Sequence, residues 1–184
     1  ALLYNAMIHP LQAYPVRGVI WYQGEANAAD IDEALRYRDQ FPAMIRQWRA
    51  QWRSPDLPFL WVQLASFGSG KDSEGRSPWA VLRESQSSAL SLPATAQVVA
   101  IDVGDADDIH PRDKRDVGRR LALAARRVAY GEDVPWSGPV ATGTAFADGA
   151  AGVRFDTGAG ALAARGGGDA VHGFEPAGAE RVFR

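Results

Sequence analysis

Cysteine is absent from the 184-residue sequence, and only three histidines are present. The first absence excludes a disulfide framework and a thiolate zinc site, and so few histidines leave few routes to any metal; the sequence predicts no metal and no cofactor. No apolar run approaches the roughly 18 residues of a membrane-spanning helix, so no membrane partner is expected. The net charge of −2, with both signs interspersed, lacks the basic footprint of a nucleic-acid-binding protein.

Hydrophobic residues make up 46% of the chain, which is enough for one sizeable core. They gather in short strand-like runs and in longer stretches with helical spacing. The runs that predict strands span residues 17–22, 58–64 and 97–103. The stretches that predict helices span residues 1–12, 32–53, 78–91 and 114–130. Strands that alternate with helices indicate an α/β fold with a parallel sheet and right-handed crossovers.

Several side chains in these elements carry specific expectations. The run at 17–22 lacks polar alternation, which suits a strand buried on both faces of the sheet. On the helix at 78–91, Leu90 is expected to face inward, whereas Gln86 belongs with its polar neighbours on a solvated face. The last helix is expected to present its arginines to solvent, namely Arg119, Arg120, Arg126 and Arg127.

Polar side chains follow the first predicted strand, where Gln23, Gly24 and Glu25 begin a turn. Open parallel sheets bind ligands at the carboxyl ends of their strands, so these residues are candidates for a site. Gly24 lets the backbone turn tightly. A strand-to-helix turn without chemical function explains the same residues equally well, with Asn27 or Asp30 as the helix cap.

His110 follows the third predicted strand in an acidic loop, two residues after Asp108 and three after Asp107. Either carboxylate could hold the imidazole in one tautomer and stabilise it once protonated, as the acid of a Ser-His-Asp system does. The nucleophile is missing from this picture. The serines of the loop at 66–77 lie in no G-x-S-x-G elbow, and that loop reads as a mobile flap beside the site.

The composition shifts after the last helix, which divides the chain into predicted domains at 1–133 and 134–184. The second part is rich in glycine and alanine, with short strand-like pieces such as VRFDT, and predicts the start of a β-rich module. It has too few large side chains for a core of its own. Because the chain begins inside an apolar segment without an initiator methionine, we expect it to be an excerpt from a longer protein.

The chain resembles the sialate O-acetylesterase group of SGNH-type carbohydrate esterases in four blocks: GVIWYQGEANA, PFLWVQLA, LRESQ and DDIHPRDKRDVGRRLALAARRVAYG. The tail, with SGPV and a later GFEPAG, resembles the start of that family's accessory β domain. The resemblance implies a three-layer, flavodoxin-like α/β hydrolase domain, here incomplete. It further implies removal of acetyl groups from hydroxyls of sialic acids or related sugars through a serine acyl-enzyme.

The same resemblance assigns roles to the candidate residues. It makes His110 the general base, and the D-x-x-H spacing of the superfamily puts Asp107 slightly ahead as the orienting acid, while the pattern of closer relatives selects Asp108. Gln23 matches the block that contributes to the oxyanion hole, Gly24 could add its backbone N–H, and Glu25 braces the loop.

The chain departs from the family at the nucleophile, because the G-Q-S-N block that carries the serine is absent. We therefore expect the serine to lie outside this chain, on a preceding segment that was cleaved and stayed bound or on a companion chain. An exposed sheet edge is expected where that strand belongs, and the chain alone is expected to be inactive. The family tends to be exported, whereas the chain itself leaves the compartment open.

Other functions fit parts of the same sequence. An acetyl-xylan or other polysaccharide acetylesterase would share the Gln-Gly-Glu turn. A non-catalytic carbohydrate-binding fragment would use an aromatic side chain to stack on sugar rings, for which Trp21, Trp61 and Trp79 are the candidates. A metal-dependent hydrolase would hold a hard cation through the oxygens of the acidic loop.

Overall fold

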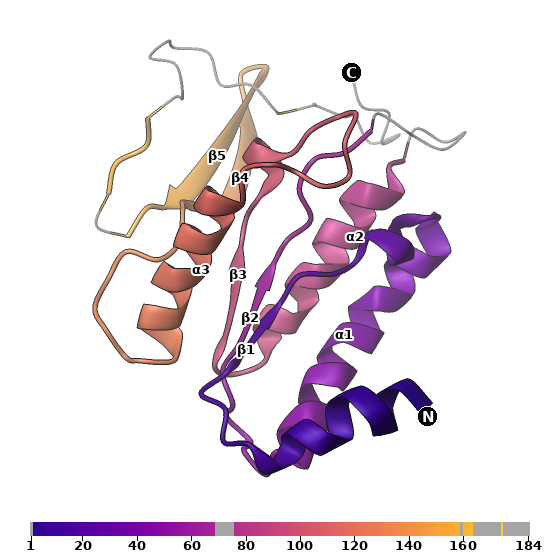
Figure 1. Cartoon of the computed structure of the whole chain (residues 1–184). Helices are drawn as coiled ribbons and strands as arrows, with labels where there is room; N and C mark the ends of the chain where they lie inside the picture. The colour runs from indigo at the N-terminus through magenta and orange to yellow at the C-terminus, as the bar shows by residue number, and fades with distance from the viewer. Residues whose placement is uncertain (1, 69–75, 159, 164–173, 175–184) are drawn as a thin grey trace. The chain divides into compact units, whose positions relative to one another are not determined.

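The structure is a computed structural model, which describes residues 2–68, 76–158, 160–163 and 174. The chain forms two compact units, Ala1–Val134 and Pro135–Arg184. Helical turns and strands alternate along the first unit (Figure 1). Its elements are η1 (Tyr4–Ile8), η2 (His9–Ala13), β1 (Val19–Trp21), η3 (Glu25–Ala28), α1 (Ile31–Gln51), β2 (Phe59–Val62), α2 (Pro78–Ser87), η4 (Ser88–Ser91), β3 (Thr95–Val98), η5 (Ile101–Val103) and α3 (Lys114–Val128).

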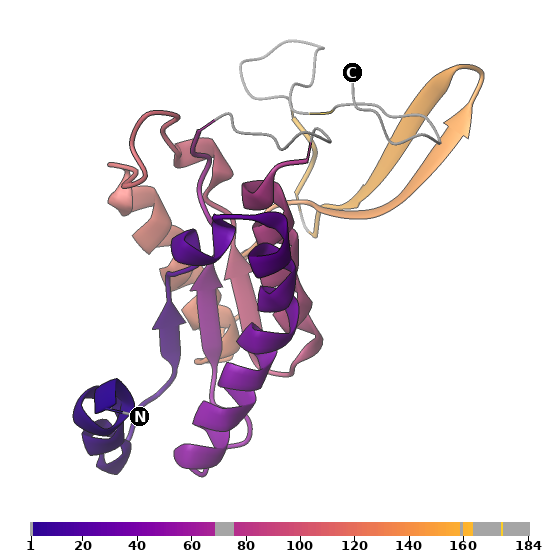
Figure 2. The same cartoon turned by 90° about the vertical axis from the view of Figure 1, so that its right-hand side faces the viewer.

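A parallel sheet of three strands in the order β1-β2-β3 forms the middle of this unit. The register pairs Trp21 with Trp61 and Trp61 with Gln97. Helices α1 and α2 cover one face of the sheet and α3 covers the other (Figures 1 and 2). The predicted α/β class and parallel sheet are therefore confirmed, and β2, whose residues are all buried, is the central strand.

The helices begin where local chemistry predicts. Asp30 caps α1 by accepting a hydrogen bond from the Glu33 backbone N–H at 2.9 Å, and Ser77 and Asp113 cap α2 and α3 in the same way. The apolar stripe of α1 packs on the sheet, where Phe41 lies against Trp61 with ring centroids 5.2 Å apart. No helix within the described residues is both long and apolar enough to cross a membrane.

Strand β1 differs from its prediction. It is shorter than 17–22 and is not buried on both faces, because Ile20 is 63% exposed. The physical reason is its place at the edge of the sheet: α3 packs over β2 and β3, while Val19 and Trp21 on the opposite face of β1 pack against the aromatic core. The third strand spans Thr95–Val98 instead of 97–103, so it begins earlier than predicted and ends earlier, because the chain then turns into η5.

The prediction of one continuous helix over 78–91 is wrong for its last residues. The α-helix ends at Ser87 and continues as the tighter turn η4, which leaves Leu90 exposed instead of facing inward. A tighter helix rotates each later side chain relative to an α-helical projection, so the periodicity no longer predicts the buried face.

The second unit contains an antiparallel pair, β4 (Val140–Ala147) and β5 (Ala150–Asp156). Asp148 and Gly149 connect the strands and both have positive φ values, 52° and 74°, as the tight turns of hairpins require. The register shifts between Ala141 and Gly143. A strand at VRFDT is thus confirmed, whereas most of the predicted module after residue 163 lies outside the described residues.

Candidate functional site

The loops that follow β1, β2 and β3 leave the same end of the sheet (Figure 2). Two contacts join them. The Lys114 ammonium group lies 5.4 Å from the centre of the Tyr22 ring, which connects the start of α3 to the end of β1. The Gly68 backbone N–H donates to the Ala106 carbonyl at 3.0 Å, which connects the loops after β2 and β3. The turn at Gln23 and the loop of His110 thus lie at the same end of the sheet, where the strands have their carboxyl ends.

His110 presents its side chain to solvent, with 86% of it exposed. Asp108 lies beside it: its Oδ1 accepts a hydrogen bond from the His110 backbone N–H at 2.9 Å and lies 3.7 Å from the imidazole Nδ1. Asp107 is placed differently, since its own N–H donates to Asp105 Oδ1 at 3.0 Å. Among the described residues, the imidazole therefore pairs with Asp108.

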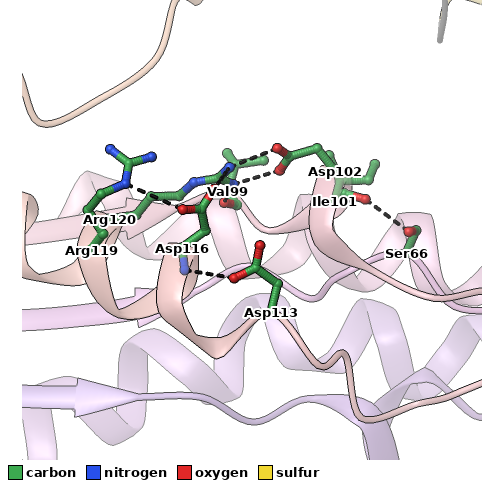
Figure 3. Close-up of polar contacts among 8 residues, drawn as sticks. All are labelled: Ser66, Val99, Ile101, Asp102, Asp113, Asp116, Arg119 and Arg120. Carbon is green, nitrogen blue, oxygen red and sulfur yellow. Dashed lines mark hydrogen bonds and ion pairs between the residues drawn. The ribbon is translucent and has the colours of Figure 1, made fainter.

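Arg120 anchors the chain where it leaves β3 toward His110 (Figure 3). Its Nη1 and Nη2 donate to the two carboxylate oxygens of Asp102 at 2.6 and 2.7 Å, and Nη1 also reaches the Val99 carbonyl at 2.6 Å. The hydrogen bond from Asp102 raises the pKa of the Arg120 guanidinium. The expectation that Arg120 simply faces solvent is wrong, because it binds Asp102 of η5 and the Val99 carbonyl just after β3.

Ser66 and Gly104 bring the loops after β2 and β3 into close contact. The Ser66 hydroxyl donates to the Ile101 carbonyl at 2.9 Å (Figure 3). A side chain at Gly104 would collide with the backbone and hydroxyl of Ser66. The Ser66 hydroxyl hydrogen is thus used in this contact, and the Ser77 oxygen accepts a hydrogen bond from the Ala80 backbone N–H at 3.3 Å as the cap of α2. The rest of the predicted flap, residues 69–75, lies outside the described residues.

The Gln23 side chain is held at both ends of its amide group. Its Oε1 accepts a hydrogen bond from the Tyr37 hydroxyl at 2.9 Å, and its Nε2 donates to Asn27 Oδ1 at 2.9 Å. The Trp21 indole N–H in turn donates to the Tyr37 oxygen at 3.2 Å. The amide of Gln23 is thus oriented from inside the protein, by residues of β1, η3 and α1.

Gln86 on α2 contacts the same turn through its side-chain amide. The prediction that Gln86 lies on a solvated face is wrong. The side chain is fully buried. Its Oε1 accepts from the Leu64 N–H at 3.0 Å, and its Nε2 donates to the Gln23 and Val62 carbonyls at 3.2 and 3.3 Å. The buried amide satisfies backbone groups at the ends of two strands, which apolar periodicity along the helix does not reveal.

Gly24 follows in this turn with a φ of 153°, a conformation that favours glycine. A Cβ at this position would lie 2.9 Å from Leu82 and 3.4 Å from the Gln86 amide nitrogen. The glycine therefore serves both the backbone geometry and the close packing of the turn against α2. Glu25 begins η3 and raises the pKa of Tyr22 and Tyr37 as a secondary cause after burial.

Replacing Gln86 by leucine should lower the free energy of unfolding by about 2–4 kcal/mol, because it removes the side-chain partner of one buried N–H and of two carbonyls. Urea unfolding of the parent and the variant measures the difference. Glu84→Gln is the matched control on the same helix, since its exposed ion pair with Arg38 contributes about 0–1 kcal/mol. Equal stabilities for the Gln86 variant and the control would contradict the bracing role.

The tryptophans proposed for sugar stacking are mostly structural. Trp61 is completely buried, and Trp21 packs against Phe41, Trp48 and Phe59. Trp79 lines an open hollow of about 740 Å³ at the start of α1, while its indole N–H donates to the Ala65 carbonyl at 2.6 Å. Among the three candidates, Trp79 is therefore the one that this hollow brings into contact with solvent-accessible space.

The described acidic residues near His110 are not arranged around a common metal-binding position. Within the part of the chain that the structure describes, no three histidine, aspartate or glutamate side chains cluster as metal ligands would. Asp102 is committed to Arg120 and Asp113 to the start of α3. The acidity of the loop is thus used largely in local hydrogen bonds and ion pairs.

The polar residues of the Gln23 turn and the His110 loop follow strands of a parallel α/β sheet, and open sheets of this class bind their ligands at the carboxyl ends of the strands. Comparison with known sequences then gives the family. The model of the family "Carbohydrate esterase, sialic acid-specific acetylesterase" matches residues 1–127. The chain belongs to this family of carbohydrate esterases.

Individual relatives agree with this assignment. Sialate O-acetylesterase of Mus musculus is 40% identical over 158 residues, which cover 76% of this chain and 28% of that protein. The human enzyme is 39% identical over 158 residues, with 76% and 29% covered. The crystal structure of a carbohydrate acetylesterase from Xanthomonas citri has a TM-score of 0.92 and 60% identity, covering 99% of this chain and 42% of that one. The chain therefore spans less than half the length of each of these relatives.

Proposed function

We propose that this chain is part of a carbohydrate esterase that hydrolyses O-acetyl esters of sialic acids or related sugars through a serine acyl-enzyme. The observation that carries the proposal is the accessible imidazole of His110, paired with Asp108 at the edge of the sheet that also holds the Gln23 turn. Family membership supports the acetyl ester as the bond that is cleaved.

His110 acts as the proton carrier in this proposal. The serine hydroxyl attacks the acetyl carbonyl carbon while the imidazole takes the hydroxyl proton, and collapse of the tetrahedral intermediate expels the sugar oxygen, which receives that proton. Water then attacks the acetyl-serine, again giving a proton to His110, and acetate and free serine result. The contact at 3.7 Å supports Asp108 as the residue that orients and stabilises the imidazolium, ahead of Asp107.

Gln23 and Gly24 provide the oxyanion hole in this proposal. The Gln23 amide has one N–H bonded to Asn27 and a second N–H that bonds no described residue, so the second is available to a developing negative oxygen. The Gly24 backbone N–H is a second donor on the same turn, and Glu25 braces it.

The nucleophilic serine comes, in this proposal, from a segment outside the chain that adds a strand beside β1. The position of β1 at the end of the described strand order supports it, since its Ile20 is uncovered, and Leu3, Met7 and Leu11 in the segment before β1 are exposed too. These apolar side chains would be buried by an additional strand and its connection. The segment is either a preceding part of the same polypeptide, cleaved or intact, or a companion chain.

The 19.8 kDa chain, purified to a single species by mass spectrometry, should not hydrolyse an aryl acetate, because it has no free nucleophile in this proposal. The complete esterase, meaning this chain together with the serine-bearing segment, should hydrolyse it. A fluorophosphonate probe should label a serine outside residues 1–184 in the complete esterase. Labelling inside that range, or full activity of the isolated chain, would contradict the proposal.

A further inference from the structure

The orientation of the Gln23 amide decides whether an N–H or an oxygen faces the reacting acyl group. A carboxamide has donors at one end and an acceptor at the other, so a rotation of 180° about its last bond would replace an oxyanion donor with a repelling oxygen. The surrounding hydrogen bonds must therefore favour one orientation over the other. Tyr37 on α1 is the residue whose contacts do so.

The direction of the hydrogen bonds follows from the chemistry of the first residue. The Trp21 indole nitrogen can only donate, and it donates to the Tyr37 oxygen at 3.2 Å. The Tyr37 hydrogen is then free for Gln23, whose Oε1 lies 2.9 Å away; the Gln23 backbone carbonyl, at 3.5 Å, is a more distant acceptor. With Oε1 receiving this hydrogen, Nε2 must be at the opposite end, where it donates to Asn27.

We infer that Tyr37 is a positioning residue, which holds the amide nitrogen of Gln23 toward the acyl oxygen through a relay from Trp21 to Tyr37 to Gln23. The inference rests on the proposed function, in which Gln23 is an oxyanion donor. Tyr37 itself is buried in the core and reaches the reaction only through Gln23.

The environment of Tyr37 keeps the relay in one direction. Burial raises the pKa of Tyr37 to about 12, so its hydroxyl remains protonated and remains a donor throughout the neutral range. Its ring stacks on Phe41 with centroids 5.2 Å apart, which restrains the hydroxyl in position. A donor that is rigid and always protonated is suited to orienting an amide without titrating with it.

Tyr37→Phe in the complete esterase removes the hydroxyl and keeps the ring. We expect kcat to fall about tenfold, less than the 10²–10³-fold loss of a whole oxyanion donor, with KM within about twofold. The Gln23 side-chain amide signals in a ¹⁵N–¹H spectrum should shift, and the proton bonded to Asn27 should lose protection from exchange. Tyr130→Phe is the matched control. This tyrosine follows the C-terminal end of α3 and packs against Arg17, whereas the candidate site lies near the N-terminal end of that helix.

A double-mutant cycle separates positioning from a structural role. Gln23→Ala should lower kcat by about 10²–10³-fold, and adding Tyr37→Phe to it should cause no further loss, because the hydroxyl then has no amide to orient. An equal loss from Tyr37→Phe in both backgrounds would overturn the inference, as would normal kcat for Tyr37→Phe beside a slow Gln23→Ala. Normal kcat for Gln23→Ala would overturn the oxyanion role of Gln23, and the inference with it.

Discussion

Replacing His110 by alanine in the complete esterase should lower kcat by at least about 10³-fold, because the serine proton then has no acceptor and the leaving sugar oxygen has no donor. The loss should fall on kcat and kcat/KM alike, since the imidazole acts in the transition state. Steady-state hydrolysis of an aryl acetate measures it. The side chain is mostly exposed, so the free energy of unfolding should change little.

His9→Ala is the control for this prediction. His9 lies in η2, an exposed turn far along the chain from the sheet edge that holds His110, and its loss should leave kcat unchanged. A rate for His110→Ala within tenfold of the parent, in a protein that still unfolds cooperatively, would reject the role of His110 as general base.

Asp108→Asn should lower kcat by about 10³–10⁴-fold while leaving the fold intact. An asparagine is nearly the same size and its oxygen can still accept the His110 backbone hydrogen bond, so the loop should keep its shape. The charge that stabilises the imidazolium is lost, and the amide can favour the wrong tautomer of the ring. Comparing kcat of the variant with that of the parent measures the effect, and an unchanged melting temperature confirms that the loop survives.

Asp107→Asn is the matched control one residue away. Asp107 is exposed, and the described contacts of its backbone lead to Asp105 and away from the imidazole. Its replacement should change kcat by less than about threefold, the size expected for a screened surface charge. The reverse pattern, a large loss for Asp107 and a small one for Asp108, would assign the orienting role to Asp107.

Much of the fold could be predicted because the decisive signals are local. Asp30 was recognisable as one of two candidate helix caps, and the helical spacing of apolar residues over 32–53 predicted the helix that becomes α1. The runs at 17–22 and 58–64 predicted strands of a parallel sheet, in which β1 and β2 do pair. The exposure of Ile20 could not be predicted, since it depends on which strands α3 covers.

The sequence predicted that the Gln23 turn and His110 follow strands, but it did not predict the contacts that support them. His110 and the Gln23 turn follow strands, and parallel strands bring their carboxyl ends to one edge. Gln86 and Arg120 were predicted to face solvent, and both instead bind backbone groups brought near by the fold. Tyr37 read only as part of an apolar stripe, although its hydroxyl reaches Gln23.

By itself, then, the sequence determined the alternation of strands and helices, the caps, the imidazole with carboxylates beside it, and the absence of a serine block. The tertiary structure alone decided that Arg120 binds the Val99 carbonyl, and that Gln86, 63 residues from Gln23, supports the turn at Gln23. The physical reason is the separation along the chain of the groups that interact. Periodicity and capping depend on neighbours along the chain, whereas the partner of a buried polar group is set by how the crossovers stack helices on the sheet.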